Sequence, residues 1–418
     1  MEGIVNAEGR LSGFDLVLRN GHVATMQPVV HDPWGRIEHA LIAIEGETIA
    51  WVGPAAHAPE AATAPDIPVV DLQGGWATPG LIDAHTHLVF GGTRADEFER
   101  RLAGATYEEI ARAGGGILST VRATRAATRD ELLVTATERM HTLGAHGCTT
   151  VEVKSGYGLD VETELMMLAV GRDAAHKCGM GVSTTLLGAH AIPPEFRDDR
   201  SGYVDLVCAE MIPQAAASGL ADAVDAFCEP IAFTREECAR VLRTGAAHGL
   251  AGRLHADQLS DSGGAELAAE LGARSADHLE CTSDTGVRAM AAAGTAAVLL
   301  PGAFHFLGET RRPPIQAFRE HGVPMVVATD LNPGSSPLGS PLLAMNLACL
   351  CFGLTPAEAL AGMTRHAATV LGFTDRGTVT VGARADLACW DVSSPAELAY
   401  WMGRNPCRDV LSGGVRRI

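Results

Sequence analysis

The chain has 418 residues, of which 47% are hydrophobic and 20% are charged, a composition typical of a globular protein long enough to bury a large core. Its formal net charge of −18 argues against nucleic acid and anionic membranes as partners, because both are polyanions that the chain repels at long range. An anionic small-molecule substrate therefore needs cations placed locally at its site.

The ten cysteines are scattered and include no C-x-x-C pair, so the spacing of zinc ribbons and of disulfide frameworks is absent from the sequence. The N-terminal segment lacks a basic stretch followed by an apolar core, and no apolar run reaches membrane-spanning length. We therefore expect a protein of the reducing cytoplasm that has no membrane partner.

Strand-like segments open and close the chain. The pattern of residues 14–26 and 41–54 predicts short strands with Asn-Gly and Glu-Gly turns. Residues 377–392 and 409–418 have a similar strand-like pattern. The two ends predict one small β-sandwich domain formed by residues 1–77 and 376–418.

The middle of the chain, residues 78–375, alternates short apolar strands with Ala-rich helical segments, which is typical of βα units around a parallel sheet. The eight strand candidates are residues 80–87, 147–154, 181–190, 223–229, 251–257, 275–280, 295–301 and 324–330. Eight such units in series predict an α/β fold, the closed (β/α)₈ TIM-type barrel.

Several of these strands end on a residue that can bind a metal or transfer a proton. They are His87, His190, Glu229, His255, His278 and Asp330. Because active sites of such barrels lie at the C-terminal ends of the strands, we expect these side chains to converge at one mouth.

The spacing of His85 and His87 places both imidazoles on the same face of a strand. With His255 and Asp330 they form a set of nitrogen and oxygen ligands suited to zinc or iron. Any one of the sixteen histidines taken alone is more simply a hydrogen-bonded residue, whereas four ligands at strand ends favour a metal. A second metal in such barrels is usually bridged by a lysine that ends the fourth strand, where this chain has Glu229, so we expect one divalent ion.

A metal held in this way lowers the pKa of its water to about 7, which is hydrolase chemistry. Asp330 is placed to take the proton of the attacking water and to deliver it to a leaving nitrogen. His278 is placed to polarise the carbonyl oxygen under attack, and its alternative role is structural support behind a ligand.

The segments "PGLIDAHTH", "HADQ", "ADHLE" and "ATDLNPGSS" resemble the amidohydrolase superfamily of metal-dependent hydrolases. The segments "HLVFGGTRADEFERR", "GGGI", "VEVKSGYGLD", "LLGAHAIPPEF" and "HADQLS" resemble, more narrowly, the imidazolonepropionase family, over nearly the whole chain. The resemblance implies hydrolysis of 4-imidazolone-5-propanoate to N-formimidoyl-L-glutamate in histidine degradation, by cleavage of one cyclic amide C–N bond.

The resemblance also implies a homodimer and assigns zinc or iron binding to His85, His87, His255 and Asp330. The substrate contacts that it implies are Arg94, Tyr107, Tyr157, His190, Gln258, Asn332, Gly334 and Ser335. Arg94 offers a planar fork for the propanoate carboxylate, its alternative being a surface salt bridge. Tyr157 lies in a glycine-flanked turn after the second strand, which an ordinary β-turn also explains.

Two other functions fit parts of the pattern. A ring aminohydrolase that releases ammonia from a cytosine- or guanine-like base commonly has a proton-shuttling glutamate where this chain has Gln258. A glutamine amide cannot titrate but can hydrogen-bond to a ring, so Gln258 and Arg94 argue against that activity. A non-catalytic scaffold that lost its metal typically lacks the paired histidines or Asp330, and both are present here.

Overall fold

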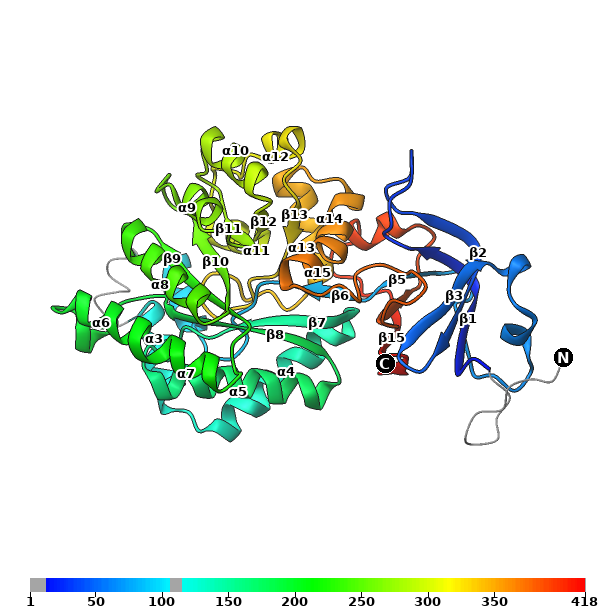
Figure 1. Cartoon of the computed structure of the whole chain (residues 1–418), viewed down its shortest axis with the longest axis horizontal. Coiled ribbons are helices and arrows are strands. Elements are labelled where there is room, and N and C mark those ends of the chain that lie inside the picture. Colours follow the sequence, from blue (N-terminus) through cyan, green and yellow to red (C-terminus); the bar gives the residue numbers. More distant parts are fainter. Residues whose placement is uncertain (1–12, 106–114, 418) are drawn as a thin grey trace.

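The computed structural model describes residues 13–105 and 115–417. Figure 1 shows two parts, a strand-and-helix barrel on the left and a β domain on the right that contains both ends of the described chain. The predicted α/β fold, a barrel with a smaller β domain from both termini, is confirmed. The limits predicted for the two domains stay a prediction.

The barrel sheet contains eight strands, each paired in parallel with its neighbour in the sequence. They are β6 (Leu81–Asp83), β7 (Cys148–Lys154), β8 (Gly181–Ala189), β9 (Ala223–Cys228), β10 (Ala251–Ala256), β11 (Ser275–His278), β12 (Ala296–Leu299) and β13 (Met325–Val327). Beyond the ends of the first and last strands, Asp330 N donates to His85 O at 3.0 Å and His87 N donates to Leu331 O at 3.0 Å. These bonds bring together the segments that carry three of the four predicted metal ligands.

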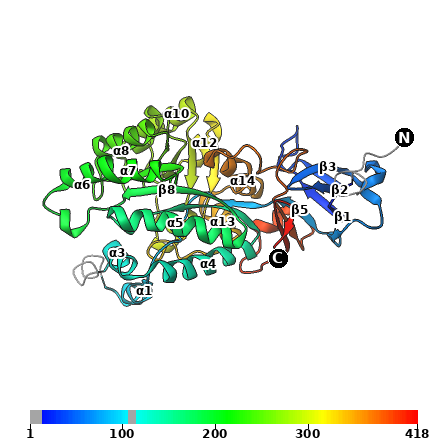
Figure 2. The same ribbon diagram turned by 60° about the horizontal axis from the view of Figure 1, so that its bottom comes forward.

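Helices cover the outside of the barrel, and Figure 2 shows α4 and α5 side by side along it. In the described part of the chain the α-helices are α1 (Ala95–Leu102), α3 (Ile117–Ala126), α4 (Arg129–Ala145), α5 (Val161–Cys178), α6 (Arg200–Leu206), α7 (Ile212–Ala217), α8 (Arg235–Ala247), α9 (Gly264–Glu270), α10 (Asp284–Ala293), α11 (Pro301–Leu307), α12 (Ile315–His321), α13 (Pro341–Leu347), α14 (Pro356–Gly362) and α15 (Arg365–Leu371). Shorter helical turns are η1 (Ala55–His57), η2 (Glu60–Thr63), η3 (Pro194–Phe196), η4 (Val207–Met211), η5 (Ala348–Phe352) and η6 (Pro395–Ala399).

Three of these helices begin at a threonine followed three residues later by a glutamate. The pairs are Thr128 with Glu131, Thr234 with Glu237, and Thr355 with Glu358. In each pair the threonine side chain accepts from the glutamate's backbone N–H, and the glutamate side chain accepts from the threonine's. This reciprocal capping satisfies donors that the first helical turn leaves unpaired, so it fixes where α4, α8 and α14 begin.

The β domain is built on one mixed sheet of eight strands. They are β1 (Leu16–Ala24), β2 (Arg36–Glu45), β3 (Thr48–Pro54), β4 (Val69–Asp71), β5 (Trp76–Pro79), β14 (Leu387–Trp390), β15 (Cys407–Ser412) and β16 (Val415–Arg416). Ile42 and Ile44 of β2 belong to one apolar cluster, whereas Leu41 and Ala43 belong to another. This alternation is the period of two expected for a strand that is covered on both faces.

The β domain contacts the barrel at the N-terminal ends of the strands. Trp390 of β14 is buried in the barrel's apolar core and donates its indole N–H to Thr78 Oγ1 at 2.9 Å. Gly147, directly before β7, has φ +88°, and a Cβ there would lie 2.3 Å from the Trp390 ring. Only glycine fits this close approach without rearrangement, so Gly147 allows the β domain to pack against this end of the barrel.

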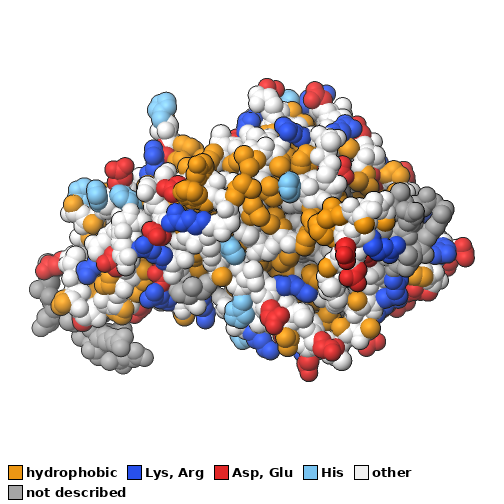
Figure 3. All heavy atoms as spheres, turned by 180° about the vertical axis from the view of Figure 1, so that it is seen from behind, with side chains coloured by type: hydrophobic (Ala, Val, Ile, Leu, Met, Phe, Trp, Pro, Cys, Tyr) orange, Lys and Arg blue, Asp and Glu red, His pale blue; other side chains and the backbone are white. Residues whose placement is uncertain are grey.

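The surface in Figure 3 shows acidic and basic side chains interspersed across that face of the molecule. Among the helices of the described residues, none is both long and apolar enough to cross a membrane.

Candidate metal centre and substrate cavity

A cavity of about 620 Å³ opens at the C-terminal ends of the barrel strands. The predicted site residues that line it are His87, Arg94, Tyr157, His190, His255, Gln258, His278, Asp330, Asn332, Gly334 and Ser335. His85 is fully buried beside His87, and Tyr107 lies outside the described residues. The C-terminal ends of six of the eight barrel strands, with the loops that follow them, therefore contribute these residues to one cavity, as the topology predicts.

Four side-chain atoms converge at the inner end of this cavity. His87 Nε2 lies 3.2 Å from His85 Nε2 and 3.4 Å from His255 Nε2. Asp330 Oδ1 lies 3.5 Å from Nε2 of His85 and 3.5 Å from Nε2 of His87. All four side chains are buried, so little water competes for these atoms.

These separations fit one metal ion. Ligands at about 2.0–2.1 Å from a tetrahedral ion such as zinc lie about 3.3–3.4 Å from one another, close to the four separations given above. His85, His87 and Asp330 form one convergent group, and His255 forms a second one with His85 and His278. Burial also holds the pKa of His85 and of His87 well below the ordinary value, which keeps both imidazoles neutral with a lone pair to share.

Two buried carboxylates lie behind the histidines. Asp277 Oδ2 lies 2.6 Å from His85 Nδ1, and Asp225 Oδ2 lies 2.9 Å from His255 Nδ1. A carboxylate beside Nδ1 favours the tautomer with the proton on that nitrogen, which leaves Nε2 free to face a metal. Burial opposes the charged form of His255, but Asp225 outweighs it and raises the pKa of that imidazole.

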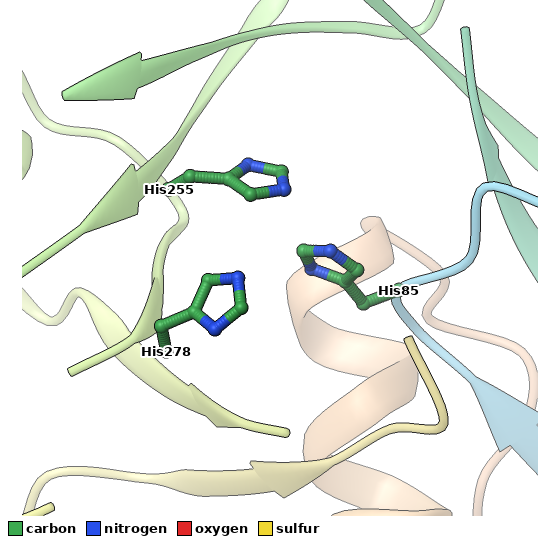
Figure 4. Close-up of side chains that lie close together, drawn as sticks. All are labelled: His85, His255 and His278. Atoms are coloured by element: carbon green, nitrogen blue, oxygen red, sulfur yellow. The ribbon is translucent and has the colours of Figure 1, made fainter. Parts of the chain in front are cut away.

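His278 lies beside the convergent atoms. Figure 4 shows its ring turned toward those of His85 and His255, and the nearest ligand atoms of the three residues lie within 4.8 Å of one another. Burial holds the pKa of His278 well below the ordinary value, so the ring is neutral and keeps one N–H to donate. His278 thus neighbours the proposed metal site from β11.

The backbone at these strand ends adopts a conformation that side-chain-bearing residues rarely take. The φ angles are +52° at Asp257, +80° at His278, +74° at Leu279 and +53° at Asp330. Such left-handed conformations are uncommon outside glycine and cluster at functional sites, where the surrounding structure holds them. Here they aim His278 and Asp330 into the mouth of the barrel.

Asp330 combines burial with a well-ordered loop. Burial raises the pKa of its carboxyl to about 7, against the opposing effect of His255. In the loop that follows, Asn332 Oδ1 accepts from the backbone N–H of Gly334 and of Ser335, both at 2.8 Å. Asn332 Nδ2 donates to Asp330 O at 2.7 Å, so this amide shapes the loop that carries Asp330.

Arg94 reaches the cavity across Gly334. A Cβ at Gly334 would lie 1.9 Å from Arg94 Nη1, so the missing side chain makes room for the guanidinium. Arg94 Nε also donates to Glu97 Oε2 at 2.9 Å, and its side chain is 20% exposed. Both interpretations of Arg94 therefore have support, since it forms an ion pair and also lines the cavity.

Tyr157 and His190 form an aromatic wall beside His87. The His190 ring stacks on that of His87 with centroids 5.3 Å apart, and the Tyr157 ring lies 5.5 Å from His190. His190 Nδ1 lies 3.0 Å from Gly156 O, and a Cβ on Gly156 would come within 2.8 Å of Nδ1. Burial lowers the pKa of His190 to about 3, so the ring is neutral.

Glu229 supports the loop that carries Gln258. Its carboxylate accepts from Leu259 N at 2.8 Å and from Ser260 Oγ at 2.7 Å. The sequence grouped Glu229 with the strand-end residues suited to metal or proton chemistry, and the structure shows these loop contacts for it.

Charged residues inside the barrel strands were not identified from the sequence as part of the site. Glu152, Lys154, Asp225, Arg253 and Asp277 are all buried beneath the histidines. Burial opposes the charged form of Lys154, but Asp225 and Glu152 outweigh it and raise its pKa. A charged residue within an otherwise apolar strand is the sequence signal that could have identified these residues. Glu152 and Lys154 lie two positions apart, and side chains with that spacing point to the same side of a sheet.

The amino-acid sequence is similar to known proteins over almost its full length. A model of the amidohydrolase family matches residues 76–416. The imidazolonepropionases of Shewanella sp. strain MR-4 and Shewanella baltica strain OS223 are 55% and 54% identical to it over 402 residues, which cover 96% of this chain and 98% of each relative.

Solved structures share the fold at lower identity. N-isopropylammelide isopropylaminohydrolase from Burkholderia multivorans ATCC 17616 has a TM-score of 0.70 and 23% identity, covering 96% of this chain and 97% of that one. A zinc-bound adenosine deaminase from Xanthomonas campestris has a TM-score of 0.70 and 20% identity, covering 97% and 93%. The matching model and the full-length Shewanella relatives show that this chain belongs to the imidazolonepropionase family of amidohydrolases.

Proposed function

We propose that the protein hydrolyses 4-imidazolone-5-propanoate to N-formimidoyl-L-glutamate. The observation that carries this proposal is the convergence of three imidazoles and Asp330 at the inner end of a cavity that Arg94 also lines. The full-length similarity to imidazolonepropionases supports the choice of substrate within the chemistry that such a site allows.

The proposed metal site holds one divalent ion, zinc or iron, bound by His85, His87, His255 and Asp330. Imidazole and carboxylate ligands suit either metal. When bound there, the ion lowers the pKa of a water molecule to about 7 and so supplies a nucleophile at neutral pH.

Asp330 is the proposed proton carrier. The attacking water loses a proton as it adds to the carbonyl carbon, and the ring nitrogen gains one as the C–N bond breaks. A buried carboxylate at the inner end of the cavity can accept that proton and return it to the ring nitrogen. Its distance of 3.5 Å from Nε2 of His85 and from Nε2 of His87 supports this role.

His278 is proposed to stabilise the oxygen that becomes negative during attack. Its neutral ring keeps an N–H, and a donor aimed at developing charge in a buried site lowers the barrier more than the same donor in water. His278 remains neutral in this role, which leaves proton transfer to Asp330.

Arg94 is proposed to bind the propanoate carboxylate through the Nη atoms beside Gly334, since its Nε is paired with Glu97. Gln258 is proposed to hydrogen-bond to the ring, because an amide both donates and accepts. The remaining proposed substrate contacts are Tyr107, Tyr157, His190, Asn332, Gly334 and Ser335. Of these, Asn332 acts through the shape of its loop.

We further propose that the protein is a cytoplasmic homodimer. The family resemblance supports the dimer, and the ten cysteines, all of them free thiols, suit a reducing compartment. Sedimentation equilibrium tests the homodimer, because a mass equal to that of one chain contradicts it.

The decisive experiment follows the ultraviolet absorbance of imidazolonepropanoate, which is unstable and is generated in place from urocanate with urocanase. Metal-loaded protein is expected to accelerate its loss above the spontaneous rate and to form a product heavier by one water molecule. Chelator-treated protein and the Asp330→Asn variant are the controls, and both are expected to be slow. If metal-loaded protein gives no acceleration, the proposed substrate is wrong, and ammonia release from nucleobases is the next assay.

A further inference from the structure

One buried lysine lies behind the proposed metal site and takes no part in the proposed reaction. Lys154 ends β7, and its side chain is fully buried. Its Nζ donates to Glu152 Oε1 at 2.9 Å and to Asp225 Oδ2 at 2.9 Å, and it lies 3.6 Å from Asp277 Oδ2. An ammonium group is costly to bury unless carboxylates surround it, so its presence here calls for a physical reason.

Two of these carboxylates hold ligand histidines directly. Asp277 Oδ2 lies 2.6 Å from His85 Nδ1, and this is the same oxygen that faces Lys154. Asp225 Oδ2 lies 2.9 Å from His255 Nδ1 and again is the oxygen bound to Lys154. Asp225 Oδ1 also accepts from the backbone N–H of His255 at 3.1 Å. The lysine therefore contacts the same atoms that orient the two imidazoles.

The third carboxylate holds the residue between His85 and His87. Glu152 Oε2 accepts from Thr86 N at 3.3 Å, and the backbone oxygen of Glu152 accepts from Thr86 Oγ1 at 2.7 Å. The backbone N–H of Lys154 donates to Thr86 O at 2.8 Å. Strand β7 thus fixes the backbone of the paired histidines through Glu152 and Lys154.

The negative charges of the surrounding carboxylates explain why a cation is buried at this position. Three carboxylates meet around Lys154, and Arg253 is a further cation near them, with its Nη1 3.9 Å from Glu152 Oε1. Without the ammonium, Asp225 and Asp277 lose the cation that lies between them, and the two carboxylates repel each other in a buried site. Each is then free to turn away from the histidine that it orients.

We propose that Lys154 is a positioning residue for the metal centre: its ammonium bridges Glu152, Asp225 and Asp277 in the orientation that holds the three ligand histidines. The inference rests on the proposed function, since it presumes that those histidines bind a metal. The proposal goes beyond the ligand set, because metal affinity then depends on Lys154, a residue that does not contact the ion.

The test compares Lys154→Met with Lys177→Met, because Lys177 is the chain's other lysine and lies exposed on α5. Zinc affinity is measured on the full chain by competition with a chromophoric chelator. Lys154→Met is expected to bind zinc about 10- to 100-fold more weakly, the usual effect of losing a residue that supports metal ligands. Lys177→Met is expected to match the wild type.

A spectroscopic readout separates positioning from general stability. In cobalt-loaded protein the d–d absorption reports the arrangement of the ligands, so Lys154→Met is expected to shift the band while Lys177→Met leaves it in place. A second variant, Lys154→Met with Glu152→Gln, removes one charge of each sign and leaves the net charge of the cluster unchanged. It is expected to show the same loss of zinc affinity, because Asp225 and Asp277 still lack their bridge.

The outcomes are distinct. Zinc binding within twofold of the wild type in either folded variant overturns the inference, and so does failure of both variants to fold, which would assign Lys154 to folding. If the wild-type protein itself binds neither zinc nor iron, the proposed metal site is wrong, independently of Lys154.

Discussion

The core of the β domain and the interior of the barrel mouth are both buried, yet they consist of opposite kinds of residue. The main apolar cluster of the β domain contains Leu18, Ile42, Ile44 and Leu387, all of them buried. Beneath the barrel mouth the buried side chains are charged or titratable, and Glu152, Lys154 and Asp225 have no exposed side-chain surface.

This difference separates the residues that stabilise the fold from the residues that are proposed to act in the reaction. Apolar burial stabilises a fold by about 25 cal/mol per Å² of buried surface, whereas buried charges are costly and persist when they perform a task. The left-handed backbone at His278 and Asp330 adds strain to the same region. Because the β domain packs at the opposite end of the barrel, substitutions in the two regions are expected to affect different properties.

The largest expected effect is on turnover at the barrel mouth. Asp330→Asn removes the proposed proton carrier and is expected to lower kcat by about 10²- to 10⁴-fold with the fold intact. The absorbance assay measures turnover, and circular dichroism measures the fold. Asp66→Asn, at an exposed position of the β domain, is the matched control. Substantial residual turnover in Asp330→Asn would move proton transfer to another group.

A smaller effect is expected for substrate binding at the rim of the same mouth. Arg94→Met removes the proposed carboxylate clamp and is expected to raise KM by about 10- to 100-fold, the range of a charge-assisted hydrogen bond, with a smaller change in kcat. Arg243→Met, exposed on α8, is the control. An unchanged KM in Arg94→Met would place the clamp elsewhere.

The comparison also shows how far sequence reasoning reaches. All eight barrel strands fall within the predicted segments, because apolar runs bounded by turns and separated by helical stretches carry a strong local signal. Strands β6 and β13 end earlier than predicted, at Asp83 and Val327. His85, His87 and Asp330 therefore lie in the segments that follow these strands rather than on them. The convergence of His85, His87, His255 and Asp330 could be predicted because the topology alone brings strand ends together.

What could not be predicted depends on contacts between strands. That Lys154 bridges Asp225 and Asp277 follows from the register of three neighbouring strands, which no local pattern specifies. The pairing of Arg94 with Glu97, and the use of the Asn332 amide within its own loop, likewise required side-chain positions. Sequence identified the residues facing the cavity better than those behind them.

A core substitution in the β domain is expected to show the reverse behaviour. Ile42→Ala removes a fully buried side chain from β2 and is expected to lower the free energy of unfolding by about 2–5 kcal/mol, from lost transfer energy and an unfilled cavity. Its kcat/KM at 25 °C is expected to stay within twofold of the wild type. Val415→Ala, exposed on β16, is the control. A loss of kcat/KM in the folded variant would show that the two regions are coupled.

The smallest expected effect tests whether a buried charge at the mouth lowers stability. Burial raises the pKa of Glu280 to about 8, whereas an unfolded glutamate titrates near about 4.3. Between those values the folded chain holds the extra proton, so this contribution to stability is fully present below about pH 4.3 and is lost as the pH rises through about 8. Glu280→Gln removes that titration and is expected to reduce the loss of unfolding free energy between pH 6.5 and pH 8.5 by about 2 kcal/mol. Chelator-treated protein excludes metal-linked protons from the measurement, and Glu236→Gln, exposed on α8, is the control. Equal pH slopes in Glu280→Gln and the wild type would assign the proton uptake to another buried group and leave Glu280 ionised at no cost to the fold.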